Sequence, residues 1–172
     1  MDLNNILGAL TGNDAIGAIS QNLKLDSSQV SSVITTALPS LLGAMQKNAS
    51  TEDGAASLAQ ALGNHAGNAG NIVNNLKTPD LADGNKILGH IFGGNLSSVL
   101  GGISKTTGVA SNSVGNILAS IAPSLLSLLG SHSGGMNAGG LSGMLGGLLG
   151  GGSSGNGGLG GILGGLGSIF GK

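Results

Sequence analysis

Residues 19–42 read ISQNLKLDSSQVSSVITTALPSLL, and residues 103–126 read ISKTTGVASNSVGNILASIAPSLL. The two stretches align without a gap when Ile19 is placed on Ile103, and their apolar positions coincide along the whole length. This agreement predicts a duplicated helical unit. Identical residues occupy the aligned positions Ile19, Ser20, Ser27, Val30, Pro39, Ser40, Leu41 and Leu42 in the first copy, and Ile103, Ser104, Ser111, Val114, Pro123, Ser124, Leu125 and Leu126 in the second.

Each copy is predicted to contain a short helix, a turn and a longer helix that begins at Ser27 or at Ser111. Small polar residues at these points offer side-chain oxygens to the free N–H groups of a helix start. Apolar residues then recur near the 3.6-residue period of an amphipathic helix. Pro39 and Pro123 lie far inside the long helices, where proline removes a hydrogen bond and clashes with the preceding turn. We therefore expect each long helix to kink or restart at its proline.

The sequence between and before the copies also reads as helical. Capping residues around 50–53 precede an apolar pattern that ends near Gly63, and shorter helical patterns cover 72–76 and 86–92. The chain has no Trp or Tyr and only two Phe, so its core is built from aliphatic residues. Composition and periodicity together favour an all-α bundle over residues 3–130.

Composition argues against several classes of function. The chain has six cationic residues, all lysine, and seven carboxylates, so it lacks the clustered arginines of a nucleic-acid-binding surface. It has no Cys, which excludes disulfides and Cys-type zinc sites. The histidines His65, His90 and His132 show no metal-binding spacing, and a site built with Asp53, Asp80 or Asp83 is disfavoured. We expect no enzyme activity, no cofactor and no small-molecule substrate.

The N-terminus shows neither a basic region nor a continuous apolar stretch, so it does not resemble a signal peptide and predicts a cytoplasmic location. The C-terminal apolar residues are broken by glycine pairs, which argues against a membrane-spanning helix. An association with a membrane surface stays open, although such helices usually carry several lysines or arginines.

The C-terminal half is uncharged: residues 106–171 contain no Asp, Glu, Lys or Arg. Its last part carries two apolar patterns at helical spacing, joined by the glycine-rich link 150–158. Glycine fills the opposite face, so we expect the second pattern to order only on contact with its own domain, a second copy or a membrane. The predicted self-association residues are Leu141, Met144, Leu145, Leu148 and Leu149 in the first pattern, and Leu159, Ile162, Leu163, Leu166 and Phe170 in the second.

Three stretches carry a family resemblance: ALPSLLGAMQKNASTEDGAASLAQAL (37–62), KILGHIFGG (86–94) and ISKTTGVASNSVGNILASIAPSLLSLLG (103–130). With the Gly/Leu-rich tail, they resemble the bacterial domain of unknown function 937 family, which is related to YidB-like proteins. The resemblance covers most of residues 5–130. It implies an all-helical, homeodomain-like fold for the duplicated unit, and it implies no reaction and no catalytic residue.

These observations predict an all-α multihelical domain over residues 1–130 and a Gly/Leu-rich association tail over 131–172. The leading hypothesis is a non-enzymatic structural protein that forms homo-oligomers or polymers through its uncharged C-terminal half. One alternative is an adaptor or regulatory module that binds nucleic acid or protein through the duplicated unit, although the lack of arginine disfavours nucleic acid. The other alternative is peripheral membrane association through the tail.

Overall fold

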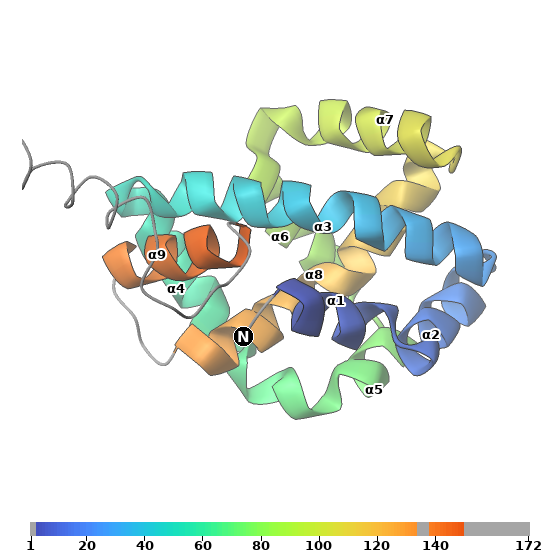
Figure 1. The fold of residues 1–172 in the computed structure, drawn as a ribbon, viewed down its shortest axis with the longest axis horizontal. Coiled ribbons are helices and arrows are strands. Elements are labelled where there is room, and N and C mark those ends of the chain that lie inside the picture. Colours follow the sequence, from blue (N-terminus) through green and yellow to red (C-terminus); the bar gives the residue numbers. More distant parts are fainter. Residues whose placement is uncertain (1–2, 134–137, 150–172) are drawn as a thin grey trace, which may run out of the picture.

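The computed structural model describes residues 3–133 and 138–149 of the 172-residue chain. Regular structure in these residues is entirely helical, so the all-α prediction is confirmed (Figure 1). Two 3-10 segments, η1 (Ala66–Asn71) and η2 (Gly93–Asn95), connect α-helices. The α-helices are α1 (Leu3–Thr11), α2 (Asn13–Leu23), α3 (Ser27–Ala49), α4 (Glu52–His65), α5 (Ile72–Lys77), α6 (Leu81–Phe92), α7 (Leu96–Thr107), α8 (Ser111–Ser133) and α9 (Ala138–Leu149).

The aligned copies form the same local structure. The short and long helices are α2 and α3 in the first copy and α7 and α8 in the second, and the long ones begin at Ser27 and Ser111 as predicted. The short helices also end at equivalent residues, Lys24 and Gly108, whose φ angles are 54° and 73°. A residue in this left-handed region stops a helix and turns the chain. The homeodomain-like character of the unit stays a prediction.

The two prolines do not interrupt their helices. α3 and α8 each run for 23 residues, so the expectation of a restart at Pro39 or Pro123 is wrong. Pro123 has no N–H to donate to the carbonyl of Ala119, one turn earlier. Gly84 of α6 lies against that carbonyl so closely that an added Cβ would clash with the Ala119 backbone. Gly84 thus lets α6 approach α8 closely at the Ala119 carbonyl, which lacks a helical donor because residue 123 is proline.

The structure extends the repeat well beyond the aligned stretches. The tripeptide Ile6-Leu7-Gly8 of α1 recurs as Ile87-Leu88-Gly89 in α6. Both α1 and α6 precede the short helix of their copy. After the long helices, α9 repeats α4: Leu58 and Leu62 correspond to Leu141 and Leu145, and all four are buried. Each half of the domain therefore has four helices in the same order, α1 to α4 and α6 to α9.

The two halves exchange their last helices. α4 packs on α8 of the second half, whereas α9 packs on α3 of the first half, and α4 and α9 contact each other. Figure 1 shows α9 beside α3 and α4 at one end of the molecule. Because each last helix covers the long helix of the other half, the two halves share one apolar core.

α8 lies at the centre of this core. Its segment Ser111–His132 is long and apolar enough to cross a membrane, but 78% of its 18-residue stretch with a mean hydropathy of 1.5 is buried inside the domain. Residues 117–122 and 124–130 are all buried. Packing within the domain therefore accounts for the apolar, uncharged sequence of α8.

η1 and α5 connect the two halves and pack on helices of both. η1 packs on α8, and α5 packs on α2 and α8. The Nδ2 of Asn22 in α2 donates to two carbonyls at the end of α5, that of Leu76 at 2.9 Å and that of Lys77 at 2.7 Å. In Figure 1, α5 and α7 lie on opposite sides of the molecule.

Candidate functional site

The first apolar pattern of the predicted tail lies in α9 and packs on its own domain. Leu141 and Leu145 are each only 1% exposed, and Met144 is half-buried against the core. Their neighbours belong to α3 and α4. Of the three partners considered for the tail, this pattern therefore contacts its own domain.

The remaining predicted association residues lie outside the described structure. α9 ends at Leu149, and the side chains of Leu148 and Leu149 are not described. The boundary expected between residues 130 and 131 falls inside α8, which ends at Ser133. The second apolar pattern is beyond the described residues, namely Leu159, Ile162, Leu163, Leu166 and Phe170.

Two hollows lie along the junction of α3 and α7, and together we call them the α3–α7 groove. One hollow, of about 390 Å³, is lined entirely by serine and threonine. The other, of about 620 Å³, continues past the glycines of η2 and contains one lysine, Lys47. The lining residues used below are Ser31, Ser32, Thr35, Thr36, Thr106 and Thr107 in the first hollow, and Ser40, Ala44, Lys47, Asn48 and Val99 in the second.

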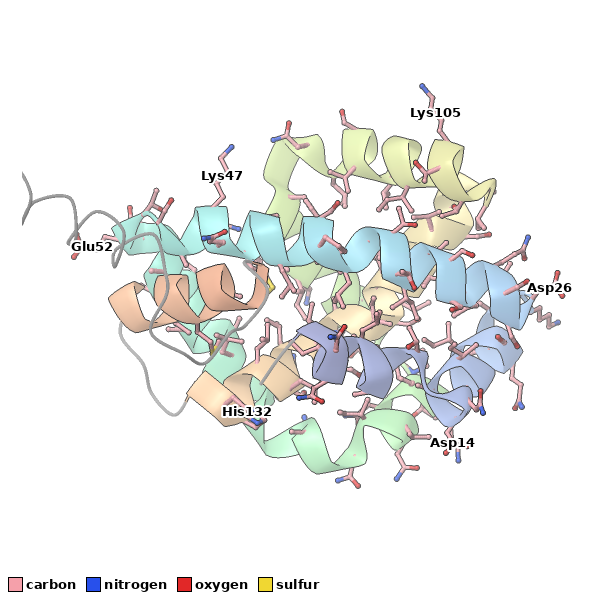
Figure 2. All side chains as sticks on the ribbon, in the orientation of Figure 1. Asp14, Asp26, Lys47, Glu52, Lys105 and His132 are labelled. Carbon is pink, nitrogen blue, oxygen red and sulfur yellow. The ribbon has the colours of Figure 1, made fainter. Side chains whose placement is uncertain are left out.

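Three of the six hydroxyl groups that line the first hollow donate within their own helices. Thr35 Oγ1 donates to the carbonyl of Ser31 at 2.9 Å, and Thr106 and Thr107 donate in the same way within α7 at 3.0 and 2.8 Å. Figure 2 shows the lysines at the edges of the groove, Lys47 and Lys105, pointing outward from the molecule. The first hollow is therefore a surface of small uncharged residues, and the second adds the apolar side chains of Ile91, Phe92 and Val99.

A third hollow, of about 420 Å³, lies between α4 and α6 and is lined by both polar and apolar residues. Asp53 of α4 and His90 of α6 line it, together with Asn48 of α3. Asn48 Nδ2 donates to the main-chain carbonyls of Ile91 at 2.9 Å and His90 at 3.3 Å, and so ties α3 to the end of α6. His90 is exposed and borders both this hollow and the larger part of the α3–α7 groove.

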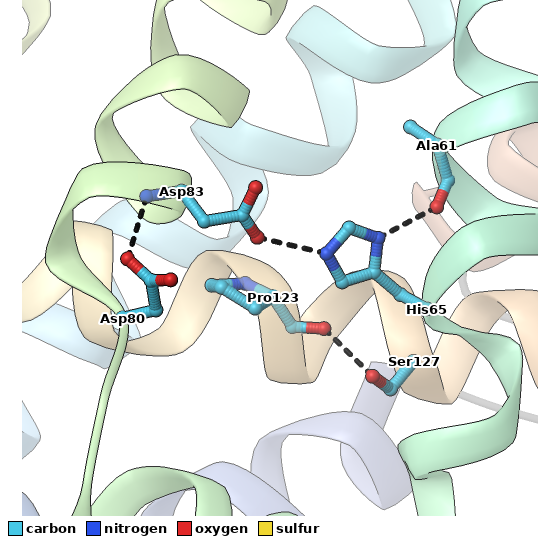
Figure 3. A network of polar contacts seen from close by, with 6 residues as sticks. All are labelled: Ala61, His65, Asp80, Asp83, Pro123 and Ser127. Carbon is cyan, nitrogen blue, oxygen red and sulfur yellow. Dashed lines mark hydrogen bonds and ion pairs between the residues drawn. The ribbon is translucent and has the colours of Figure 1, made fainter.

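His65 joins the end of α4 to the start of α6 (Figure 3). Its Nδ1 lies 2.8 Å from the carbonyl of Ala61, and its Nε2 lies 2.9 Å from Oδ2 of Asp83. Both partners are acceptors, so both bonds form when the ring carries two protons. Asp80 caps α6 by accepting from the Asp83 N–H at 2.9 Å. Because Asp83 is 41% exposed, this ion pair is a helix tether of modest energy.

The described residues assemble no site of recognisable reactivity. No group of three or more His, Asp or Glu side chains gathers among them to hold a metal ion. α8 carries buried serines, of which Ser127 donates to the carbonyl of Pro123 at 2.8 Å (Figure 3). Ser124 is fully buried, and none of the described residues bonds its Oγ, so no base is placed to activate it.

The side chains that fasten the helices together were missed in the sequence. Asn22 and Asn48 each use one amide to hold the last carbonyls of a distant helix, and their partners lie 54 to 55 and 42 to 43 residues further along the chain. A single asparagine within a helical pattern carries no local signal of such a bond. The sequence does show that the leucines of α4 recur in α9, but their spacing differs by one residue from that of the gap-free alignment.

A family model described as a bacterial protein of unknown function (DUF937) matches residues 5–132. This match covers more than half of the chain, and the chain therefore belongs to this family, as the resemblance implied. The matched region ends within α8 and does not include α9. No curated protein and no solved structure gives a significant match to the chain.

Proposed function

We propose that this member of the DUF937 family is a non-enzymatic structural protein that self-associates into oligomers or filaments through its C-terminal tail. The observation that carries the proposal is a contrast within the tail. The first apolar pattern is already buried in α9, where Leu141 and Leu145 complete the core. The second pattern follows with five further large apolar side chains and no charged residue before Lys172.

The proposal assigns association to the residues beyond α9. The uncharged sequence of α8 reflects burial in the domain and gives no support for contacts between copies. The proposal therefore rests on residues 159–170, which lie beyond α9. Burial of five apolar side chains at about 2 kcal/mol each would release on the order of 10 kcal/mol, as an upper value. Such a segment is stabilised by contact, whichever copy supplies the surface.

Exchange of this segment between copies is a simple route to assembly. Any element that packs on its own domain through a long link can pack on a second copy by the same contacts. Reciprocal exchange closes a dimer, whereas exchange in one direction continues into an open chain. Both outcomes need only the tail and a surface that accepts it.

Light scattering over a wide range of protein concentration tests the proposal. We compare the full chain with a chain that ends at Leu149, because this truncation keeps α9 and its core leucines. The full chain should gain mass with concentration and give regular particles in negative-stain microscopy, while the truncated chain stays monomeric. The double substitution Leu163→Ser/Leu166→Ser should behave like the truncation, and the matched control Ser153→Ala/Ser154→Ala like the full chain. Equal masses for all four proteins at every concentration would contradict the proposal.

A further inference from the structure

α5 covers the junction between α2 of the first half and α8 of the second, and the described residues place no helix over the equivalent junction between α7 and α3. α5 packs where α2 meets α8, and Leu76 is fully buried there. Asn22 holds the end of α5 through the carbonyls of Leu76 and Lys77. In the first half, the segment that follows α4 thus closes the junction between the short helix α2 and the long helix α8.

The repeat places the equivalent junction between α7 and α3, which is the α3–α7 groove. Asn22 corresponds to Thr106 in the gap-free alignment of the two copies. Both side chains bond the carbonyl four residues earlier at 3.0 Å, Asn22 that of Ala18 and Thr106 that of Gly102. These two carbonyls are themselves equivalent in the repeat. Thr106 therefore occupies the same local position on α7 that Asn22 occupies on α2, next to an uncovered groove.

The chain that follows α9 preserves the spacing found after α4. Fourteen residues separate the buried Leu62 from Leu76, and fourteen separate its equivalent, the buried Leu145, from Leu159. In the first half Ile72 precedes Leu76 by four residues, whereas Leu163 follows Leu159 by four. The apolar stripe of the tail therefore begins at Leu159 and continues away from α9.

The link between α9 and Leu159 is long enough to reach the groove. Gly146 of α9 lies beside Gln46 of α3, because a Cβ added to that glycine would be 3.1 Å from the Gln46 Nε2. From Gln46 to Thr35 the path along α3 is about 17 Å at 1.5 Å per residue. Residues 150–158 consist only of Gly, Ser and Asn, and nine extended residues span about 30 Å.

The second hollow of the groove suits an uncharged apolar segment, because Ile91, Phe92 and Val99 line it. In the first hollow, the hydroxyls of Thr35, Thr106 and Thr107 are bonded within their own helices, so insertion of leucine leaves these three groups paired. Residues 159–170 have no charge to desolvate. Lys47 and Lys105 point outward at the edges and need not be buried (Figure 2).

We infer that the α3–α7 groove seats residues 159–170 of the same chain, and that Leu159 takes there the place that Leu76 takes between α2 and α8. The tail then completes the second half as α5 completes the first. This binding of the tail in the α3–α7 groove goes beyond the proposed function, because it occurs whether or not copies exchange their tails. Exchange of the seated segment would link copies.

Disulfide trapping in the full chain tests the seat, since the protein contains no Cys of its own. The test variant is Thr35→Cys/Leu159→Cys, and the matched control is Asn74→Cys/Leu159→Cys, with the first cysteine on exposed α5. After mild oxidation at low protein concentration, trypsin releases Thr35, Asn74 and Leu159 in three separate peptides. Thermal unfolding of the reduced variants establishes that both are folded.

The test variant should form a link within one chain at least about tenfold faster than the control, because a seated segment raises the local concentration of the second thiol. Equal rates in the two variants would overturn the inference. Predominant links between chains would overturn the seat in the same chain and show that a second copy supplies the segment. Light scattering of the unsubstituted protein reports on assembly separately, so failure of the seat and failure of the proposed function give different results.

Discussion

The two halves of the domain contain the same helices in the same order, yet their long helices have different surroundings. Thr35 and Ser40 of α3 are exposed, whereas the equivalent Ala119 and Ser124 of α8 are buried. α4 and α6 pack on α8 as their counterparts α9 and α1 pack on α3, but η1 and α5 pack on α8 in addition, and among the described residues α3 has no counterpart of them and borders the α3–α7 groove. The comparison teaches that the repeated sequence determines the helices, whereas the segments that follow each repeat determine which surface is left accessible.

The largest effects should come from the two equivalent leucines of α4 and α9. Leu62→Ala and Leu145→Ala should each lower the free energy of unfolding by about 3 kcal/mol, because both side chains are fully buried. Urea unfolding followed by circular dichroism measures this. The half-buried neighbour Met144→Ala is the control and should cost clearly less. An unchanged stability in Leu145→Ala would mean that α9 does not complete the core as α4 does.

Close packing of α6 on α8 gives the next prediction. Gly84→Ala should lower the free energy of unfolding by about 2 kcal/mol, since the added methyl group forces α6 away from the Ala119 carbonyl. Gly89→Ala lies in the same helix with no neighbour near the added methyl, and should raise stability by about 0.5 kcal/mol through helix propensity. The same urea titration compares them, and equal effects would contradict the close approach.

The amide of Asn22 should matter more than the hydroxyl of its equivalent. Asn22→Ala should cost about 1.5 kcal/mol, because it leaves the last carbonyls of α5 without their donor. Thr106→Ala removes only a bond within α7 and should cost less than about 0.5 kcal/mol. Hydrogen exchange at the amides of α5 should accelerate in the first variant alone. Similar rates of hydrogen exchange at α5 in both variants would contradict the predicted difference between Asn22 and Thr106.

The smallest effects should come from the two helix stops with positive φ. Lys24→Gly should raise the free energy of unfolding by about 0.5 kcal/mol, because glycine adopts this conformation without strain. Gly108→Ala should lower it by about 1 kcal/mol for the opposite reason. Thermal melts of the two variants compare them. Shifts of the same sign would show that these stops are not equivalent.

Much of the fold was readable from the sequence. The gap-free alignment placed the starts of α3 and α8 at Ser27 and Ser111, because capping residues and helical periodicity act locally. The restart expected at the prolines was wrong, whereas the kink stays a prediction. In α8 the lost hydrogen bond coincides with a close approach of Gly84 from another helix, and that contact cannot be inferred from the helix itself.

The candidate site was only partly readable. The spacing of Leu141 and Leu145 predicted an apolar helix face, but nothing local indicated that α3 would be its partner. The sequence gives no sign of the α3–α7 groove, because its serines and threonines are ordinary residues for an exposed helix face. It becomes visible only when the halves are compared in space, since the covering of α2 and α8 by α5 is a tertiary property.

Energy transfer between differently labelled copies tests most directly the claim that the tail joins them. A single cysteine at Asn74, on exposed α5, carries a donor dye in one batch and an acceptor dye in another. On mixing, the full chains should show energy transfer that grows with concentration, while chains that end at Leu149 should show none. No transfer in the full chain at any concentration, or equal transfer in both, would contradict the account.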